Sequence, residues 1–261
     1  MRGFMKIVVS IGGSVLAKEL QPENFKSYAN AIKEIGKDHA VFIVTGGGKA
    51  AREYIGVARD LGSDEATCDF IGIDITRINA RLLIAAIGDA AYYEPPLNYK
   101  EARTASLTGK IIVMGGVTPG QTTDAVSAVL AEYIGADLLI NATSIDGVYT
   151  SDPKKNKDAK KFGTMMPHQL IEIVMKTEMV AGANSPIDLL AAKIIERSNI
   201  KTIILNGQNP QNIIDAVSGK YNGTLIGKDK KVKVKPGQKQ KTEFEKDACN
   251  LGYYSSDGCD K

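Results

Sequence analysis

Three glycine-rich turns, each directly after a short β-branched run, constrain the fold of this chain more than any other feature. The runs begin at Lys6, Ala40 and Lys110, and they lead into Gly12-Gly13, Gly46-Gly47-Gly48 and Gly115-Gly116. A short apolar run followed by glycine is typical of a buried strand and a tight turn. Because such turns carry no side chains, a ligand can approach their backbone N–H groups, which favours a phosphate or another anion.

The residues that follow the glycines strengthen this interpretation. A glycine after a strand can also serve only as a turn, or allow a close helix–strand contact. Here Lys49 and Arg52 follow the second turn, and Thr122, Thr123 and Asp124 follow the third. The chain contains neither a G-x-x-x-x-G-K-[ST] string nor a G-x-G-x-x-G string. The sequence therefore predicts phosphate binding by another type of glycine turn.

Strand and helix patterns alternate through most of the chain. Strands are expected at 6–11, 40–45, 111–114, 137–141 and 201–205, and helices near 22–36, 49–61, 123–134, 167–175 and 187–198. A further helical pattern starts at Ile71, a polar segment follows at 92–100, and a short helix starts at Pro210. This alternation predicts a three-layer αβα fold with a mostly parallel central sheet. In such sheets ligands bind at the carboxyl ends of the strands, where all three glycine turns are expected.

The composition narrows the class of protein. A chain of 261 residues can form one large α/β domain or two closely joined lobes. The net charge of +3 depends on lysines near the C-terminus, so no nucleic-acid partner is indicated. Cys68, Cys249 and Cys259 are too few for a disulfide framework or a zinc site, and a reducing cytoplasm is the expected compartment. We expect no signal peptide and no membrane span.

The composition changes after Gly227. Residues 228–241 are rich in lysine, and residues 242–261 are acidic. We interpret 228–261 as a flexible tail, an appended segment or an expression remnant. Binding of this basic segment to a polyanion is the less favoured alternative.

The histidines argue against one large class of enzymes. His39 and His168 are the only two, both lie outside the glycine turns, and both are expected at the surface. A Ser-His-Asp hydrolase is therefore not indicated. Phosphoryl transfer needs little acid–base help and much charge neutralisation, so it suits the residues present.

Four charged side chains near the turns each have a functional and a merely structural interpretation. Lys49 and Arg52 are expected to project to one side over the anion site, or to be solvated cations on a helix. Asp124 can cap the helix that follows it, or hold lysines or Mg²⁺ between two phosphates. Asp69, expected between two helical segments, can cap a helix or accept hydrogen bonds from a sugar hydroxyl.

The segment 143–153 is the most distinctive loop. Thr143 follows a strand end, Asp146-Gly147 predicts a tight turn, and Tyr149 and Asp152 come next. Asp-Gly and Asp-Pro pairs are also common in ordinary turns. A tyrosine ring and a carboxylate at the carboxyl end of a strand can hold an adenine and a ribose, so we expect a nucleotide site here.

Several longer strings can be compared with known families. They are Ile-Gly-Gly-Ser (11–14), Gly-Gly-Gly-Lys-x-x-Arg (46–52), Asp-x-x-Gly-Ile (69–73), Thr-Arg-x-Asn-Ala (76–80), Met-Gly-Gly-x-x-Pro-Gly-x-Thr-Thr-Asp-Ala (114–125) and Asp-Gly-Val-Tyr-Thr-x-Asp-Pro-Lys-Lys (146–155). Together they resemble the amino acid kinase superfamily, and in particular its archaeal uridylate kinases. The resemblance extends from about Met5 to Ile226.

The resemblance implies an amino acid kinase (carbamate kinase-like) fold in a single domain at 5–227. The part to about residue 136 would mainly bind the acceptor, and 137–227 would mainly bind ATP. The implied activity is transfer of the γ-phosphoryl of ATP to UMP, giving UDP and ADP, with Mg²⁺, in pyrimidine nucleotide biosynthesis. The implied assembly is a homo-hexamer, and neither nucleic acid nor membrane is an implied partner.

The resemblance also implies roles for individual residues. ATP would be held by Gly13, Ser14, Gly48, Arg52, Thr143, Tyr149 and Asp152. UMP would be held by Gly47, Asp69, Val117, Thr118, Pro119, Gly120, Gln121, Thr122 and Thr123. The implied catalytic residues are Arg52, Asp124 and Lys49. No protein metal ligand is implied, because the phosphates of the nucleotides would hold most of the Mg²⁺ coordination.

The chain departs from the family pattern at a few positions. Ser10 stands where many superfamily members have a lysine, which leaves Lys6, Lys49 and Lys193 as candidate phosphate-bridging cations. Gln121 and Val117 stand where His and Thr are common in related sequences, so the affinity for UMP can differ from that of the relatives. The alternatives are another kinase of the superfamily, with acetylglutamate, carbamate or isopentenyl phosphate as acceptor, and a non-catalytic nucleotide-binding or storage assembly. Control by UTP or GTP is also open.

Overall fold

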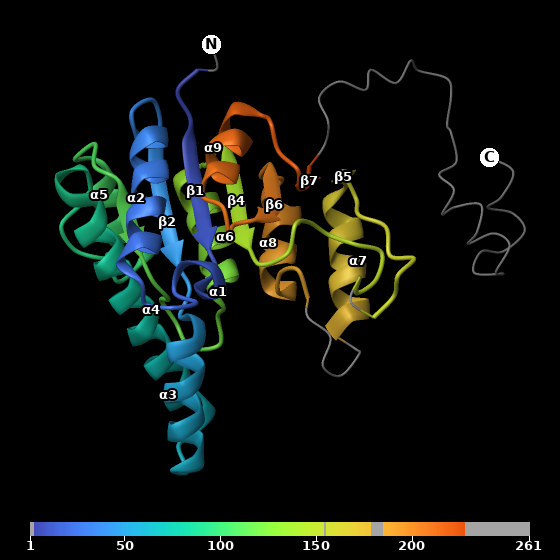
Figure 1. Ribbon diagram of the computed structural model, residues 1–261, viewed down its shortest axis with the longest axis horizontal. Coiled ribbons are helices and arrows are strands. Elements are labelled where there is room, and N and C mark those ends of the chain that lie inside the picture. The colour runs from blue at the N-terminus through green and yellow to red at the C-terminus, as the bar shows by residue number, and fades with distance from the viewer. Residues whose placement is uncertain (1–2, 154, 179–184, 228–261) are drawn as a thin grey trace, which may run out of the picture. The chain divides into compact units, whose positions relative to one another are not determined.

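Strand β1 (Lys6–Ile11) lies in the interior of a seven-stranded sheet in the computed structural model, which describes residues 3–153, 155–178 and 185–227 (Figure 1). The tail expected at 228–261 lies outside these residues. The strand order is β3-β2-β1-β4-β6-β7-β5. The other strands are β2 (Ala40–Thr45), β3 (Ile112–Met114), β4 (Leu138–Thr143), β5 (Thr164–Met165), β6 (Thr202–Asn206) and β7 (Thr224–Ile226).

The sheet is mostly parallel, as predicted. Ile7 pairs with Val41 of β2 on one side and with Leu138 of β4 on the other. β3 and β6 continue the parallel order outward, whereas β7 runs antiparallel to β6. The carboxyl ends of β1, β2, β3, β4 and β6 therefore meet at one edge, and the three glycine turns lie at that edge.

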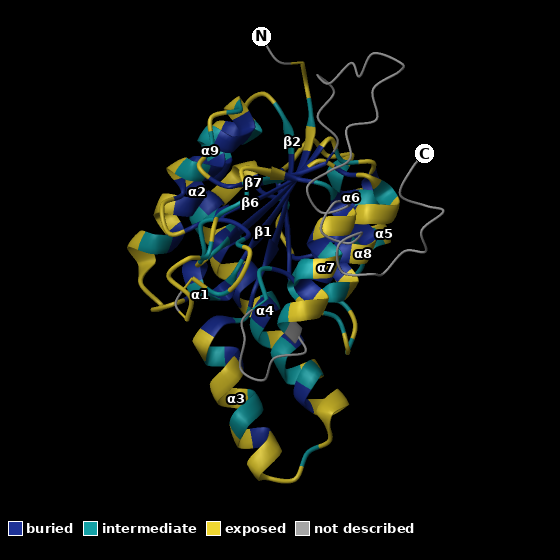
Figure 2. Ribbon diagram, turned by 90° about the vertical axis from the view of Figure 1, so that its right-hand side faces the viewer, coloured by how far each residue is buried: buried dark blue, intermediate teal, exposed yellow. Residues whose placement is uncertain are grey.

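Helices cover both faces of the sheet and form three layers with it (Figure 2). One face packs against α2 (Pro22–Gly36), α9 (Gln211–Ser218) and the C-terminal half of α4 (Glu65–Ile87). The other packs against α5 (Tyr99–Ser106), α6 (Thr123–Ile134), α7 (Pro167–Glu178) and α8 (Leu189–Ser198). A strand buried on both faces needs apolar residues at every position, which explains the continuous β-branched runs.

Polar side chains begin the helices that carry site residues. Thr122 Oγ1 accepts a hydrogen bond from Ala125 N at 3.1 Å and starts α6. Asp64 accepts from Thr67 N at 2.9 Å and starts α4, and Asp188 accepts from Ala191 N at 2.9 Å and starts α8. Each such cap is worth about 1 kcal/mol of helix stability. The first turns of α6 and α8 are thereby fixed beside the carboxyl edge of the sheet.

Helix α3 (Gly48–Asp60) and the first half of α4 form a hairpin that projects beyond the carboxyl edge of the sheet (Figure 1). Arg59 closes the turn by donating two hydrogen bonds to Glu65, at 2.8 and 2.7 Å. Because α4 runs unbroken from Glu65, Asp69 lies inside this helix. The expectation that Asp69 lies between two helical segments is therefore wrong.

Short elements were not expected from the sequence. They are α1 (Gly13–Leu16), the 3-10 helix Gly88–Ala90, α5, β5 and β7. The polar segment expected at 92–100 ends in the first residues of α5, where the Asn98 side chain accepts from Glu101 N at 2.9 Å. Within the described ranges, no helix is both long and apolar enough to cross a membrane.

Candidate active site

The backbones of the first and second glycine turns touch each other. A Cβ atom on Gly13 would lie 2.0 Å from the N atom of Gly48, and one on Gly46 would lie 2.4 Å from the N atom of Gly13. Gly48 also has a φ of +70°, in the left-handed region that favours glycine. Side chains at these positions would force the two turns apart. The glycines therefore allow main chain from β1 and β2 to meet at one point.

This meeting point presents several backbone donors. No described group accepts a hydrogen bond from the N–H of Gly13, Ser14, Gly47 or Gly48. These residues lie at the starts of α1 and α3, and the N-terminus of a long helix such as α3 carries a partial positive charge. Free N–H groups at such a place form a site for phosphate. The structure thus brings together the predicted ATP-binding residues Gly13, Ser14 and Gly48 with the predicted UMP-binding residue Gly47.

Asp124 lies in the first turn of α6, next to two polar residues of the sheet. Ser10 of β1 donates from Oγ to Asp124 Oδ1 at 3.0 Å. Asn141 pairs with Ser10 across the β1–β4 ladder, and its buried Nδ2 forms no hydrogen bond with any described group. Burial raises the pKa of Asp124 to about 6, whereas the Ser10 hydrogen bond favours the ionised form and the negative charge of Asp188 opposes it. Asp124 is therefore a carboxylate that titrates close to neutral pH.

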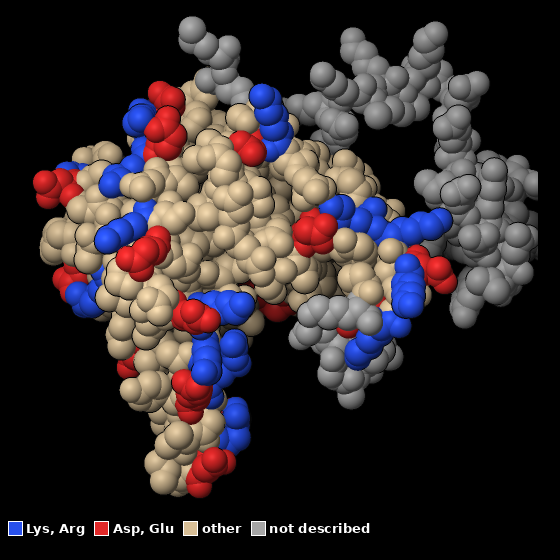
Figure 3. Space-filling model, viewed as in Figure 1, with Lys and Arg blue, Asp and Glu red and all other residues tan. Residues whose placement is uncertain are grey.

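The predicted cations lie on α3. Lys49 is exposed and lies 3.4 Å from the Glu53 carboxylate, and Arg52 is exposed with no ion pair to any described residue. Lys and Arg side chains lie along the side of the α3–α4 projection that is turned toward α7, interleaved with acidic ones (Figure 3). Among the described residues no cation forms an ion pair with Asp124. The expected role of Asp124 in holding lysines is thus not seen in these contacts.

The two other lysines expected as phosphate-bridging candidates lie in different places. Lys6 begins β1 at the opposite edge of the sheet, where its ammonium donates to Ile134 O at 3.0 Å. A strand of this length separates Lys6 from the glycine turns by about 15 to 20 Å. Lys6 is therefore wrong as a phosphate-bridging candidate. Lys193 is exposed on α8.

The predicted acceptor loop 117–123 is attached to α4. Asp69 Oδ2 accepts a hydrogen bond from Gly120 N at 2.7 Å. Gln121 Oε1 accepts from Tyr99 Oη at 3.0 Å, and burial raises the pKa of Tyr99 to about 12, which keeps this donor protonated. Thr122 also donates to Asp188 at the start of α8. The structure therefore brings Asp69 and the loop together, as predicted, and links the loop to α8.

The predicted nucleotide loop 143–153 is held by a cluster around Asp146. Its carboxylate accepts from Tyr149 Oη at 2.9 Å and from Lys161 Nζ at 2.9 Å. Partial burial acts to raise the pKa of Asp146, but the Lys161 and Tyr149 hydrogen bonds outweigh it and lower the pKa. The loop contacts β7 as well, because Thr224 Oγ1 accepts from Val148 N at 2.8 Å. Tyr149 and Thr143 are half-buried at this edge.

Sequence reasoning missed four residues that shape this edge. Tyr28 is buried on α2 and donates to the carbonyl of Gly207, while Lys161 holds Asp146. Thr76 and Asn79 are buried polar residues of α4 that bond to the glycine turns. For Tyr28, Thr76 and Asn79 the available signal was their position on the buried side of a helix, because buried polar groups need partners. Lys161 lies outside the helices and gave no such signal.

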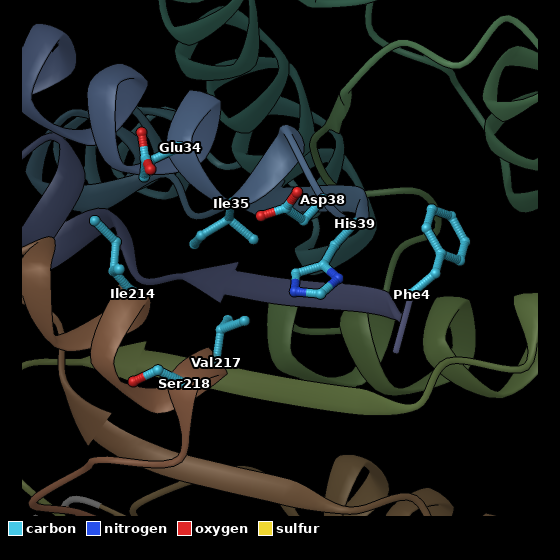
Figure 4. Close-up of a pocket in the computed structure, with 8 residues that line it drawn as sticks. All are labelled: Phe4, Glu34, Ile35, Asp38, His39, Ile214, Val217 and Ser218. Carbon is cyan, nitrogen blue, oxygen red and sulfur yellow. The ribbon is translucent and has the colours of Figure 1, made fainter. Parts of the chain in front are cut away.

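A cavity of about 650 Å³ lies elsewhere, at the amino-terminal edge of the sheet (Figure 4). It is lined by Phe4, Glu34, Ile35, Asp38, His39, Ile214, Val217 and Ser218. His39 is half-buried and accepts a hydrogen bond from Met5 N at 3.3 Å, so it lies only partly at the surface, whereas His168 is exposed as expected. No residue of the glycine turns lines this cavity, which is therefore separate from the candidate active site.

The fold and this edge define an α/β protein that gathers free backbone donors from glycine turns at the carboxyl ends of parallel strands. The model of the amino acid kinase family matches residues 5–206, and the chain belongs to this family. The resemblance seen in the sequence motifs is thereby confirmed.

Individual relatives agree with this membership. The chain is 59% identical to a uridylate kinase of Methanococcoides burtonii, over 85% of this chain and 98% of that protein. It is similar to the crystal structure of uridylate kinase from Archaeoglobus fulgidus, with a TM-score of 0.79 and 50% identity, over 85% of this chain and all of that one. The UMP kinase of Bacillus anthracis has a TM-score of 0.73 at 25% identity, over 87% and 98% of the two chains.

Proposed function

We propose that this protein is a UMP kinase, which transfers the γ-phosphoryl of ATP to UMP and yields UDP and ADP. The observation that carries the proposal is that two potential ligand sites lie next to each other at the carboxyl edge of the sheet. Free N–H groups of the first and second glycine turns suit phosphates, and loop 117–123, bonded to Asp69, suits a second ligand. The names of the relatives support UMP as that ligand. The reaction belongs to pyrimidine nucleotide biosynthesis.

In this proposal the two halves of the chain divide the substrates. The part to about residue 136 mainly binds UMP, with Gly47, Asp69 and loop 117–123. The part at 137–227 mainly binds ATP, with Thr143, Tyr149 and Asp152, aided by Gly13, Ser14, Gly48 and Arg52 from the first half. Asp69 accepts hydrogen bonds from the ribose hydroxyls of UMP. Asp69 Oδ2 already accepts from Gly120 N, and a carboxylate can accept several hydrogen bonds.

The chemistry is direct in-line transfer without a covalent intermediate. Backbone N–H groups of Gly13, Gly47 and Gly48, with the cations Arg52 and Lys49, spread the charge of the transferring phosphoryl group. Asp124 stays ionised at neutral pH and attracts the cationic groups that approach with the nucleotides. Since the acceptor is already a phosphate, no side chain has to remove a proton from it.

Mg²⁺ fits this site as a companion of ATP. Within the described ranges no group of three or more His, Cys, Asp or Glu side chains could hold a metal ion. Mg²⁺ commonly takes phosphates and waters together with one or two carboxylates, and Asp124, with Asp188 nearby, is the carboxylate that suits this. The ion neutralises charge on the phosphates when bound.

We propose a homo-hexamer in the cytoplasm as the working form. The α3–α4 hairpin supports an assembly, because it exposes apolar side chains, among them Tyr54, Val57, Leu61 and Phe70 at 61, 60, 80 and 56%. Another copy of this chain is the occupant we propose for that surface. Light scattering should give the mass of six chains. The proposal includes no nucleic acid and no membrane.

The decisive assay measures ADP formation from Mg-ATP with UMP, CMP, dTMP, AMP and acetylglutamate offered separately. We expect a strong preference for UMP. Phosphorylation of a different acceptor would leave the proposed ATP site standing and would show that UMP is not the substrate. ATP binding without turnover of any acceptor would favour a non-catalytic assembly and direct attention to Ser10.

Replacement of Arg52 tests the donor half. We expect Arg52→Ala to lower kcat/KM by about 10²-fold, which corresponds to about 3 kcal/mol of lost transition-state stabilisation. Lys18→Ala is the matched control, because Lys18 is another exposed cation outside the proposed machinery. Near-normal turnover of Arg52→Ala would remove Arg52 from the site.

A further inference from the structure

A buried amide on α4 holds the second glycine turn. Asn79 is only 2% exposed, and its Nδ2 donates to Gly46 O at 2.8 Å and to Gly47 O at 3.3 Å. Burial of an amide is unfavourable unless its polar atoms are hydrogen-bonded. Both hydrogens of this amide group therefore have acceptors, and both acceptors are carbonyl groups of the same turn.

These two bonds determine which way the turn faces. In a planar trans peptide the carbonyl and the N–H of the next residue point in opposite directions. The Gly46 carbonyl shares its peptide with the N–H of Gly47, and the Gly47 carbonyl shares its peptide with the N–H of Gly48. Because Asn79 draws both carbonyls toward α4, the N–H groups of Gly47 and Gly48 point away from α4. Neither N–H has an acceptor in the described part of the chain.

Helix α4 also binds the third glycine turn, but there a buried hydroxyl of the helix accepts a hydrogen bond from the turn. Thr76, three residues before Asn79, accepts a hydrogen bond through Oγ1 from Gly116 N at 2.7 Å. That contact uses an N–H group of its turn, whereas Asn79 uses only carbonyls. One face of α4 therefore leaves the donors of the second turn available and occupies a donor of the third. The Gly47 carbonyl also accepts from Ala51 N at 3.5 Å within α3, but Asn79 is the one described donor to the Gly46 carbonyl, whose peptide carries the N–H of Gly47.

We infer that Asn79 is a positioning residue for phosphoryl transfer, which keeps the N–H groups of Gly47 and Gly48 directed at the γ-phosphoryl of the bound nucleotide. The inference rests on the proposed function for the nature of the ligand. Removal of one aligned donor of this type lowers kcat by about 10²- to 10³-fold in enzymes that stabilise developing charge. Asn79 itself lies behind the turn and acts through it.

The test compares Asn79→Asp, which keeps the shape but loses the donor, with Leu83→Val, a buried change on α4 away from the turns. We expect Asn79→Asp to lower kcat by at least 100-fold. We also expect about tenfold weaker binding of AMP-PNP with unchanged binding of ADP, because only AMP-PNP carries a third phosphoryl group. Leu83→Val should change neither quantity by more than about twofold, although both variants melt at a lower temperature.

Several results would overturn the inference. A kcat within about threefold of wild type would do so, as would equal loss of affinity for ADP and AMP-PNP, which is the result of a merely structural role. If Asn79→Asp does not fold, Asn79→Ala, which also removes the donor, provides the same comparison. If the wild type fails to phosphorylate UMP, the proposed function fails, but the ratio of AMP-PNP to ADP affinity still decides the role of Asn79.

Discussion

Replacement of Asp124 by asparagine should stabilise the protein while it inactivates the site. The change keeps the shape of the side chain, and the oxygen of the new amide can still accept the hydrogen bond that Ser10 now donates at 3.0 Å. It removes a negative charge that burial disfavours and that lies near Asp188. In the proposed mechanism the reaction needs this charge. Its removal should therefore raise the stability of the protein and lower its activity.

The size of the effect follows from the pKa of Asp124. Folding raises this pKa from 3.8 to about 6, or by about two units, and each unit corresponds to 1.36 kcal/mol. Between these two pKa values the folded state binds more protons than the unfolded state. The free energy of unfolding therefore falls as the pH rises through this window, by at most about 3 kcal/mol. The penalty is absent below about pH 4 and complete above about pH 7.

Urea unfolding followed by circular dichroism between pH 4.5 and 8 measures this effect. At pH 7.5 we expect Asp124→Asn to be more stable than wild type by about 2 kcal/mol, with most of the difference lost at pH 4.5. Its kcat should fall at least 100-fold, and wild-type kcat/KM should decline below about pH 6. Asp60→Asn, an exposed change of equal charge, is the control. A gain that is the same at both pH values, or a loss of stability at pH 7.5, would refute the reasoning.

Three further substitutions test other contacts of the site. Asp69→Asn should mainly raise KM for UMP, and an effect confined to ATP would mean that the two lobes are assigned backwards. Tyr28→Phe removes the buried hydrogen bond to the Gly207 carbonyl and should lower the free energy of unfolding by about 1 to 2 kcal/mol, measured by urea titration, whereas an unchanged value would exclude that bond as a contributor. Gly13→Ala places a methyl group against Gly48 N and should abolish AMP-PNP binding in calorimetry; normal affinity would contradict the contact between the turns.

The main features of the fold could be predicted because they depend on local patterns. Strands buried on both faces give continuous apolar runs, and glycine marks their carboxyl ends, so the parallel sheet and its functional edge follow from β1, β2 and β3. β5 and β7 could not be predicted, because strands of two and three residues leave no periodicity. β7 pairs with β6, and β5 pairs with β7, which lies far from it in the sequence.

The site was predictable in its residues and less so in its contacts. The glycine turns and Asp69 were identified by residue type and loop 117–123 by the resemblance to the family, and the structure brings Asp69 to Gly120. The positions of Lys6 and Asn79 were not accessible in the same way. Which edge a lysine faces depends on strand direction, and the partner of a buried amide depends on how α4 packs against the sheet.

The interior position of β1 in the sheet also affects how the chain folds during synthesis. β2 is the next strand after β1, so this pair can form while synthesis continues. The other edge of β1 remains unpaired until β4 emerges, since the partner of Ile7 on that side is Leu138. An apolar strand with unpaired backbone groups is prone to pair with other chains. Nascent chains that stall between residues 45 and 138 should therefore aggregate, whereas chains released after β4 should not.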